Sequence, residues 1–222
     1  MGSNVFDLIG PIMVGPSSSH TAGAVRLGAM ALKILGGDLA EGKITLHGSF
    51  AETGKGHGTD LALVAGLLGL KPDDERIVEA KQLAQAKGIN ISFEKSNPPD
   101  AHPNSVTFEL TDKLGKQVRV FGSSIGGGRI IIKGINEFNV EIMGDYPTLV
   151  ILNRDLPGVV AQVTSLLATT QINIAQMRVS REKRGAKALT VVETDQTIEP
   201  AALELMRKLP SVYQAMAIEP LE

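Results

Sequence analysis

The stretch Thr148–Gly158, TLVILNRDLPG, decides the fold of the C-terminal part of this 222-residue chain. Its first five residues, Thr148–Leu152, are mostly aliphatic or β-branched and predict a strand. Pro157 is a residue favoured in the first turn of a helix, and apolar residues recur at helical spacing over Val159–Leu167. The sequence therefore predicts a strand that runs into an amphipathic helix.

The segments after this helix complete a strand-helix-strand-strand-helix-strand order. Ile172–Ser180 and Lys187–Val192 read as two strands, joined by the charged connection Arg181–Gly185. A second helix is predicted from Glu199, and Val212–Ile218 can close the sheet. Four strands with two helices on one face form a ferredoxin-like sandwich, βαββαβ.

The N-terminal part predicts a larger α/β (α+β) domain. We place the boundary near Met143–Pro147, which gives domains of residues 1–146 and 147–222. The proline-rich segment Ser96–Asn104 predicts a surface loop. The predicted helices are Thr21–Leu35, Asp60–Leu70 with Thr59 as its cap, and a helix from Asp73 or Asp74 to Lys87. The predicted strands are Ile44–His47, Ile89–Phe93, Val106–Leu110, Val118–Gly122 and Arg129–Lys133, with Asp112–Gly115 as a hairpin turn.

Composition excludes several classes of function. The 22 Lys and Arg residues against 24 Asp and Glu residues leave no basic excess for nucleic acid, and Trp is absent. Cys is absent too, so this chain alone holds no disulfide, thiol nucleophile or iron–sulfur cluster. No window approaches the ~20 apolar residues of a membrane span, and no basic-then-apolar leader begins the chain. We expect a cytoplasmic protein that does not bind membranes.

The string Gly15–Thr21, GPSSSHT, is the most unusual one in the chain. It directly precedes a predicted helix, whose first N–H groups lack partners and can bind a carboxylate or phosphate. A strong helix cap with surplus serines is the alternative. The string therefore makes Ser17, Ser18, Ser19, His20 and Thr21 candidates for binding a ligand.

The second unusual string, Gly48–Asp60, presents Lys55 and His57 ahead of another predicted helix. It differs from a mononucleotide-binding loop in the spacing of its glycines and in having Gly56 after the lysine. The string predicts an exposed loop in which His57 is a second candidate for a functional residue, and a glycine loop with solvated His57 and Lys55 is the alternative.

Other motifs carry weaker signals. The glycines in Gly122–Arg129 favour a bulged turn between two strands, although they also permit close approach of a ligand. His47 and His102 look incidental, and no residue spacing is typical of a metal site.

In the C-terminal domain, the turn at the first helix and the start of the next strand could together bind a small amino acid. The free N–H groups of the turn would take its carboxylate, and an Asn amide from a second copy its ammonium. A helix cap and a loop asparagine are the alternative. The residues predicted to bind an effector are Asn153, Asp155, Leu156, Pro157, Gly158, Asn173 and Ile174.

These strings resemble a known family. Gly15–Gly23, Gly56–Asp60 and Ser124–Gly128 are similar to the β component of bacterial iron–sulfur-dependent L-serine dehydratase. The run from Leu149, with its Asp155–Gly158 turn, resembles an ACT regulatory domain. Together the two resemblances cover nearly the whole chain.

The resemblance implies deamination of L-serine to pyruvate and ammonia without pyridoxal phosphate. It implies a [4Fe–4S] cluster on a separate α subunit, which this cysteine-free chain would join. It also implies an N-terminal domain like the allosteric substrate-binding domain of some phosphoglycerate dehydrogenases. By the same resemblance, Ser17, Ser18, Ser19 and Thr21 would bind the substrate and His20 and His57 would be the catalytic candidates, all at an active-site cleft shared with the α subunit. The ACT domain would pair with a second copy. The alternative is an amino-acid-sensing regulatory module of another metabolic enzyme.

Overall fold

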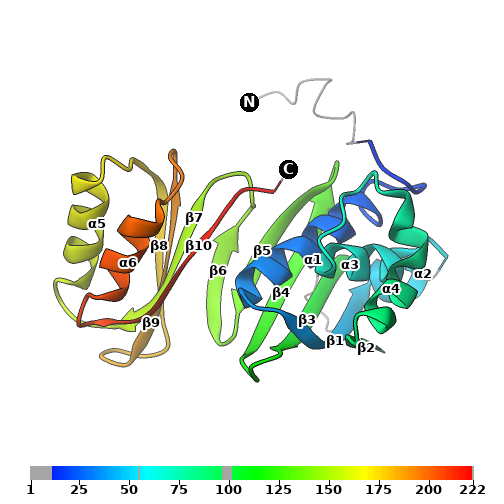
Figure 1. Ribbon diagram of the computed structural model, residues 1–222, viewed down its shortest axis with the longest axis horizontal. Coiled ribbons are helices and arrows are strands. Elements are labelled where there is room, and N and C mark those ends of the chain that lie inside the picture. Colours follow the sequence, from blue (N-terminus) through cyan, green and yellow to red (C-terminus); the bar gives the residue numbers. More distant parts are fainter. Residues whose placement is uncertain (1–11, 55, 97–101, 222) are drawn as a thin grey trace. The chain divides into compact units, whose positions relative to one another are not determined.

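The structure is a computed structural model that describes residues 12–54, 56–96 and 102–221. It contains two compact units, which divide after Asn136 (Figure 1). The boundary inferred from sequence, between residues 146 and 147, lies ten residues later and remains a prediction. No helix of the described residues is long and apolar enough to cross a membrane.

The first unit is built on five strands of one sheet, in the order β2-β1-β3-β4-β5. β1 and β2 are parallel, and the other neighbours in this order are antiparallel. Each strand was predicted from its apolar run, and each extends beyond that run at one end or both. The bounds are β1 Leu39–Gly48, β2 Asn90–Lys95, β3 Asn104–Asp112, β4 Gln117–Gly126 and β5 Arg129–Ile135.

Helices cover one face of this sheet (Figure 1). They are α1 Ala22–Leu35, α2 Ser49–Thr53, α3 Thr59–Leu67, the 3₁₀ helix η2 Glu75–Glu79 and α4 Ala80–Ala86. α1 ends as predicted, at Gly36 with φ 67°. Two expectations were wrong. The segment of α2 was predicted to be part of a loop. Thr59 does not cap α3 but is its first residue, because Gly58, with φ 69°, occupies the capping position.

Two glycines allow α1 and α3 to pack with their backbones in contact. A Cβ added to Gly66 of α3 would lie 2.0 Å from the carbonyl oxygen of Val25 in α1. A Cβ added to Gly28 of α1 would lie 2.3 Å from the carbonyl oxygen of Leu63 in α3. This close crossing fixes the starts of the two helices relative to each other.

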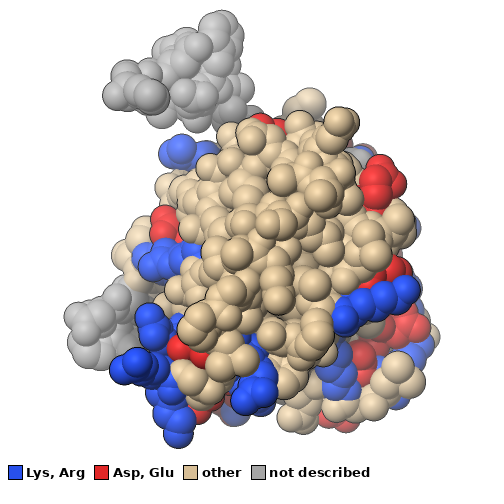
Figure 2. All heavy atoms as spheres, turned by 90° about the vertical axis from the view of Figure 1, so that its left-hand side faces the viewer, with Lys and Arg blue, Asp and Glu red and all other residues tan. Residues whose placement is uncertain are grey.

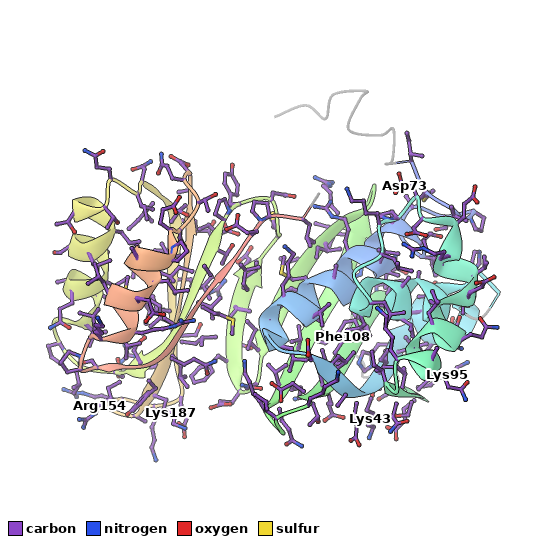
Figure 3. All side chains as sticks on the ribbon, in the orientation of Figure 1. Lys43, Asp73, Lys95, Phe108, Arg154 and Lys187 are labelled. Carbon is purple, nitrogen blue, oxygen red and sulfur yellow. The ribbon has the colours of Figure 1, made fainter. Side chains whose placement is uncertain are left out.

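The core of the first unit lies between the sheet and these helices. Phe108 of β3 and Leu27 of α1 are fully buried there, and Figure 3 labels Phe108. Lys43 of β1 lies on the other face of the sheet, where it forms ion pairs with Glu94 and Glu109 at 3.0 and 3.8 Å. The alternation of apolar and polar residues along β1 and β3 therefore separates a helix-covered face from a charged one.

The second unit contains the predicted ferredoxin-like sandwich. Its four-stranded sheet has the order β10-β7-β9-β8, and its core includes Leu149, Val163 and Met206. Pro157 lies before α5 rather than in its first turn, since Gly158, with φ 90°, occupies the capping position. β6 was not predicted. The bounds are β6 Phe138–Ile142, β7 Thr148–Arg154, α5 Val159–Thr169, β8 Ile174–Arg181, β9 Lys187–Thr194, α6 Pro200–Arg207 and β10 Val212–Ile218.

α5 carries no charged residue, and Val160 on it is 46% exposed. Figure 2 shows a broad uncharged surface on this side of the second unit, with basic and acidic side chains near its rim. Arg154 and Lys187, which are partners in the β7–β9 register, lie together at one end of this sheet (Figure 3).

Candidate functional site

The hydroxyl-rich string before α1 folds into a tight turn. The N–H group of Thr21 donates to the carbonyl oxygen of Ser17, and that of Gly23 donates to the carbonyl oxygen of Ser18. Thr21 occupies the capping position of α1, but its side chain makes no capping hydrogen bond. The turn instead buries His20, which is 9% exposed.

Hydroxyl groups face both ring nitrogens of His20. Ser17 Oγ lies 3.3 Å from Nδ1. On the other side of the ring, Ser49 Oγ and Thr53 Oγ1 each lie 3.3 Å from Nε2. Phe50 packs edge-on against the imidazole, with 5.2 Å between ring centroids. His20 is thus a fixed side chain rather than a solvated one.

His57 lies beside His20, with 4.9 Å between the two ring centroids. The two residues, which we call the histidine pair, come from loops that precede α1 and α3. His57 Nδ1 lies 3.0 Å from the carbonyl oxygen of Thr53, and a carbonyl oxygen only accepts. His57 therefore carries its proton on Nδ1, which leaves a lone pair on Nε2 in its neutral form. His57 is an exposed residue, so solvent or a ligand can reach its ring.

Burial lowers the pKa of His20 below its ordinary value of 6.5. The neighbouring His57 lowers the pKa of His20 further, and a backbone hydrogen bond at Ser49 partly opposes both effects. The imidazole of His20 is accordingly neutral at neutral pH. Because a neutral His20 carries no positive charge, it does not repel a proton that His57 accepts.

Three fully buried hydroxyls near these helix starts have no hydrogen-bond partner among the described residues: Thr21 Oγ1, Thr59 Oγ1 and Ser124 Oγ. Ser124 lies at the end of β4 against Gly23 of α1, where an added Cβ would be only 2.2 Å from Ser124 Oγ. The turn that follows has positive φ angles at Gly126, Gly127 and Gly128 and a register shift, as a bulged hairpin requires. The strings Gly15–Thr21, Gly48–Asp60 and Gly122–Arg129 thus each contribute one buried hydroxyl that has no partner among the described residues.

Sequence reasoning missed Ser49 and Thr53, which both contact His20. Their only sequence signal is a spacing of four residues, which places two side chains on one face of a helix. That signal is informative only if the segment is helical, and the glycine-rich string around it predicted a loop. Lys55, which was predicted to accompany His57, lies outside the described residues.

The other two histidines have local structural partners. His47 Nδ1 donates to the carbonyl oxygen of Ser96, and its Nε2 accepts from Thr107 Oγ1, both at 2.9 Å. His102 Nδ1 accepts from the N–H group of Asn104 at 3.3 Å. No group of three His, Asp or Glu residues among the described residues could hold a metal ion.

The predicted effector residues of the second unit do not all present free groups. Asn153 is buried, and its side chain bonds to Thr190 Oγ1 and to the carbonyl oxygen of Arg154. Asp155 accepts from the N–H group of Gly185 and from Arg181, rather than from the start of α5. Leu156, Pro157 and Gly158 are exposed in the turn before α5, while Ile174 is partly buried.

Comparison with known proteins assigns both units. Residues 4–89 match the model of the serine dehydratase beta chain, and residues 148–211 match that of the ACT domain. The probable L-serine dehydratase beta chain of Bacillus subtilis (strain 168) is 42% identical over 215 residues, which are 97% of each chain. The chain belongs to the L-serine dehydratase beta chains. It is therefore related to a subunit of an L-serine ammonia-lyase.

Two further relatives extend this assignment of the beta chain. The L-serine dehydratase beta chain of Peptoniphilus asaccharolyticus is 42% identical over 196 residues, 88% of each chain. A D-3-phosphoglycerate dehydrogenase of Archaeoglobus fulgidus is 30% identical over 199 residues. That match covers 88% of the beta chain but only 37% of the dehydrogenase, so the sequence similarity spans both units while the rest of the dehydrogenase has no counterpart here.

Proposed function

We propose that this beta chain completes an iron–sulfur-dependent L-serine dehydratase, which converts L-serine to pyruvate and ammonia together with a separate α subunit. The observation that carries the proposal is the match to a beta chain over 97% of each chain, combined with a site of two adjacent imidazoles and several hydroxyls. These groups can bind a small hydroxy amino acid and move a proton. A cytoplasmic location fits a dehydratase of metabolism and belongs to the same proposal.

The residues of this chain do not fit an iron–sulfur cluster. Thiolates are the usual ligands of such clusters, and the chain has no cysteine. In this proposal a [4Fe–4S] cluster belongs to the α subunit, and no step of this chain's own chemistry passes through it.

Within the histidine pair, the geometry favours His57 as the base that removes the α-proton. Its Nδ1–H group is held by the carbonyl oxygen of Thr53, so the lone pair on Nε2 can accept a proton. Both ring nitrogens of His20 already face hydroxyls. This arrangement suits a role for His20 as the residue that stays neutral while the neighbouring His57 becomes charged. Ser17, Ser18, Ser19 and Thr21, ahead of the α1 N-terminus, would hold the carboxylate of the substrate.

The isolated chain is expected to bind no iron and to leave L-serine unchanged, because it has no thiolate ligands. Anaerobic reconstitution with iron and sulfide, followed by metal analysis and a pyruvate assay, measures both properties. Co-purification with an α subunit that carries the cluster cysteines should then restore turnover. Stoichiometric iron and sulfide on the chain alone would contradict the proposal.

The ACT unit is expected to form at least a homodimer. In that pairing Asn173 of one copy lies near the Asp155–Gly158 turn of the other, and an amino acid binds between them. In the structure Asn173 Nδ2 donates to Asp195, so a ligand would have to replace this bond. Sedimentation at micromolar concentration, with and without amino acids, tests the expectation. A monomer under both conditions would count against it.

A regulatory module that serves another enzyme is the second candidate. The match to D-3-phosphoglycerate dehydrogenase favours it, because there a similar sequence accompanies a different catalytic part. A module that only senses amino acids has no need of the histidine pair. Catalysis that depends on the two histidines therefore separates the two candidates.

A further inference from the structure

We propose that Thr53 is a positioning residue that holds both imidazoles of the histidine pair. Its side chain contacts His20, and its backbone carbonyl contacts His57. The role rests on the proposed function, because positioning matters for turnover only if the histidine pair serves the reaction.

The hydroxyl of Thr53 contacts the buried histidine. Thr53 Oγ1 donates to the carbonyl oxygen of Ser49 at 2.9 Å, which uses its only hydrogen. The remaining lone pairs of Oγ1 can then accept from His20 Nε2–H at 3.3 Å. In this arrangement His20 Nδ1 has no hydrogen and accepts from Ser17 Oγ at the same distance. The hydroxyl of Thr53 thus favours the tautomer of His20 that carries its proton on Nε2, and Ser49 Oγ, also 3.3 Å from Nε2, can accept from the same N–H group.

The carbonyl of Thr53 holds the loop that carries the exposed histidine. Its oxygen accepts from the N–H group of Gly56 at 3.0 Å, from the N–H group of His57 at 3.3 Å and from His57 Nδ1 at 3.0 Å. The carbonyl therefore fixes both the backbone and the ring of His57, and it directs the Nε2 lone pair away from Thr53.

α2 is anchored to the core and holds Thr53 in position for these contacts. Phe50 is fully buried, which anchors the short helix to the core. Gly48 and Gly54 flank α2. An added Cβ at Gly48 would lie 2.5 Å from the carbonyl oxygen of Pro103, and one at Gly54 would lie 2.2 Å from that of Phe50. The chain can thus follow this path closely only with glycine at both positions.

A purely structural explanation accounts for only part of this geometry. Thr hydroxyls in helices commonly bond to the carbonyl four residues earlier, and the bond to Ser49 is of this kind. Thr164 in α5 makes the same bond to the carbonyl oxygen of Val160 at 3.0 Å, and the second unit, which contains it, has no histidine. Thr164 is therefore a matched control for Thr53.

The test compares Thr53→Val, which keeps the shape but removes the hydroxyl, with Thr53→Ser and with the control Thr164→Val. In the assembled dehydratase, Thr53→Val is expected to lower kcat about 3–10-fold, the effect of losing one hydrogen bond. KM should change by less than kcat, because Thr53 contacts the imidazoles rather than the substrate. Thr53→Ser should restore kcat to within about twofold of wild type, and Thr164→Val should leave it unchanged.

Nitrogen NMR of the imidazoles in the full chain provides a readout that does not depend on activity. Thr53→Val should shift the ring-nitrogen signals and the titration of His20, and Thr53→Ser should return them. Unchanged histidine signals in Thr53→Val, or a kcat within about twofold of wild type, would overturn the positioning role. Failure of the proposed function looks different: the histidine signals would still respond to Thr53→Val, but His20→Ala and His57→Ala would retain turnover.

Discussion

His57→Ala is expected to reduce the turnover number of the assembled dehydratase by ~10²–10⁴-fold, the usual contribution of a positioned proton-transfer group. The subunit should still fold and join its α partner, because the side chain of His57 is exposed and its ring makes one hydrogen bond. Steady-state kinetics and thermal unfolding on the same preparation measure the two properties separately.

His20→Ala is expected to reduce turnover as well, and it also removes a buried ring from a hydroxyl cluster. Its thermal midpoint should therefore fall more than that of His57→Ala. His102→Ala is the control, because His102 is exposed in the loop before β3 and, among the described residues, its ring accepts from one local N–H group, that of Asn104. If both site variants kept kcat within about threefold of wild type, the histidine pair would be structural; a tenfold loss corresponds to ~1.4 kcal/mol of barrier.

Gly66→Ala is expected to lower the free energy of unfolding of the chain by about 1–3 kcal/mol, the usual cost of overpacking. The sign of the effect is informative. Alanine in a helix interior normally stabilises a protein by ~0.5–1 kcal/mol relative to glycine. If the position had space for a methyl group, Gly66→Ala would therefore raise the free energy of unfolding. There is no such room, because the new Cβ would lie 2.0 Å from the carbonyl oxygen of Val25 and neither backbone can yield without shifting a helix.

Denaturant unfolding of Gly66→Ala measures this loss, and Gly56→Ala is the control, since the nearest atom to its added Cβ is the carbonyl oxygen of Thr53 at 3.5 Å. Turnover of Gly66→Ala should also fall in the assembled enzyme. His20 and His57 lie in the loops that directly precede α1 and α3. A larger separation between these two helices therefore changes the distance between the two rings. An unfolding midpoint at or above that of wild type would contradict the close crossing.

The elements that the sequence predicts well are those whose signals are local. The glycine after Leu35 ends α1, and the apolar pattern of Val159–Leu167 gives the buried face of α5. The ferredoxin-like order of the second unit follows from such signals, one segment at a time. Both histidines of the pair also follow from local strings, because unusual polar residues precede two predicted helix starts.

What the sequence cannot provide is contact between distant segments. Ser49 and Thr53 have ordinary identities, and only the tertiary fold brings them to His20, about thirty residues earlier in the chain. α2 is too short for an apolar period, and tertiary anchoring through Phe50 outweighs the loop preference of the glycines around it. The tautomers of the two histidines, which decide their roles, depend on these same long-range contacts.

The parallel pairing of β1 and β2 has a consequence for the order of folding. The two strands can pair only after the whole stretch 49–89, with α2, α3, η2 and α4, has been accommodated between them. The antiparallel hairpins β3–β4 and β4–β5 close over short turns and have a much smaller loop entropy to overcome. Since α2 and His57 both lie within the long stretch, we expect the histidine pair to come together late in folding, after the hairpins of β3, β4 and β5 have formed.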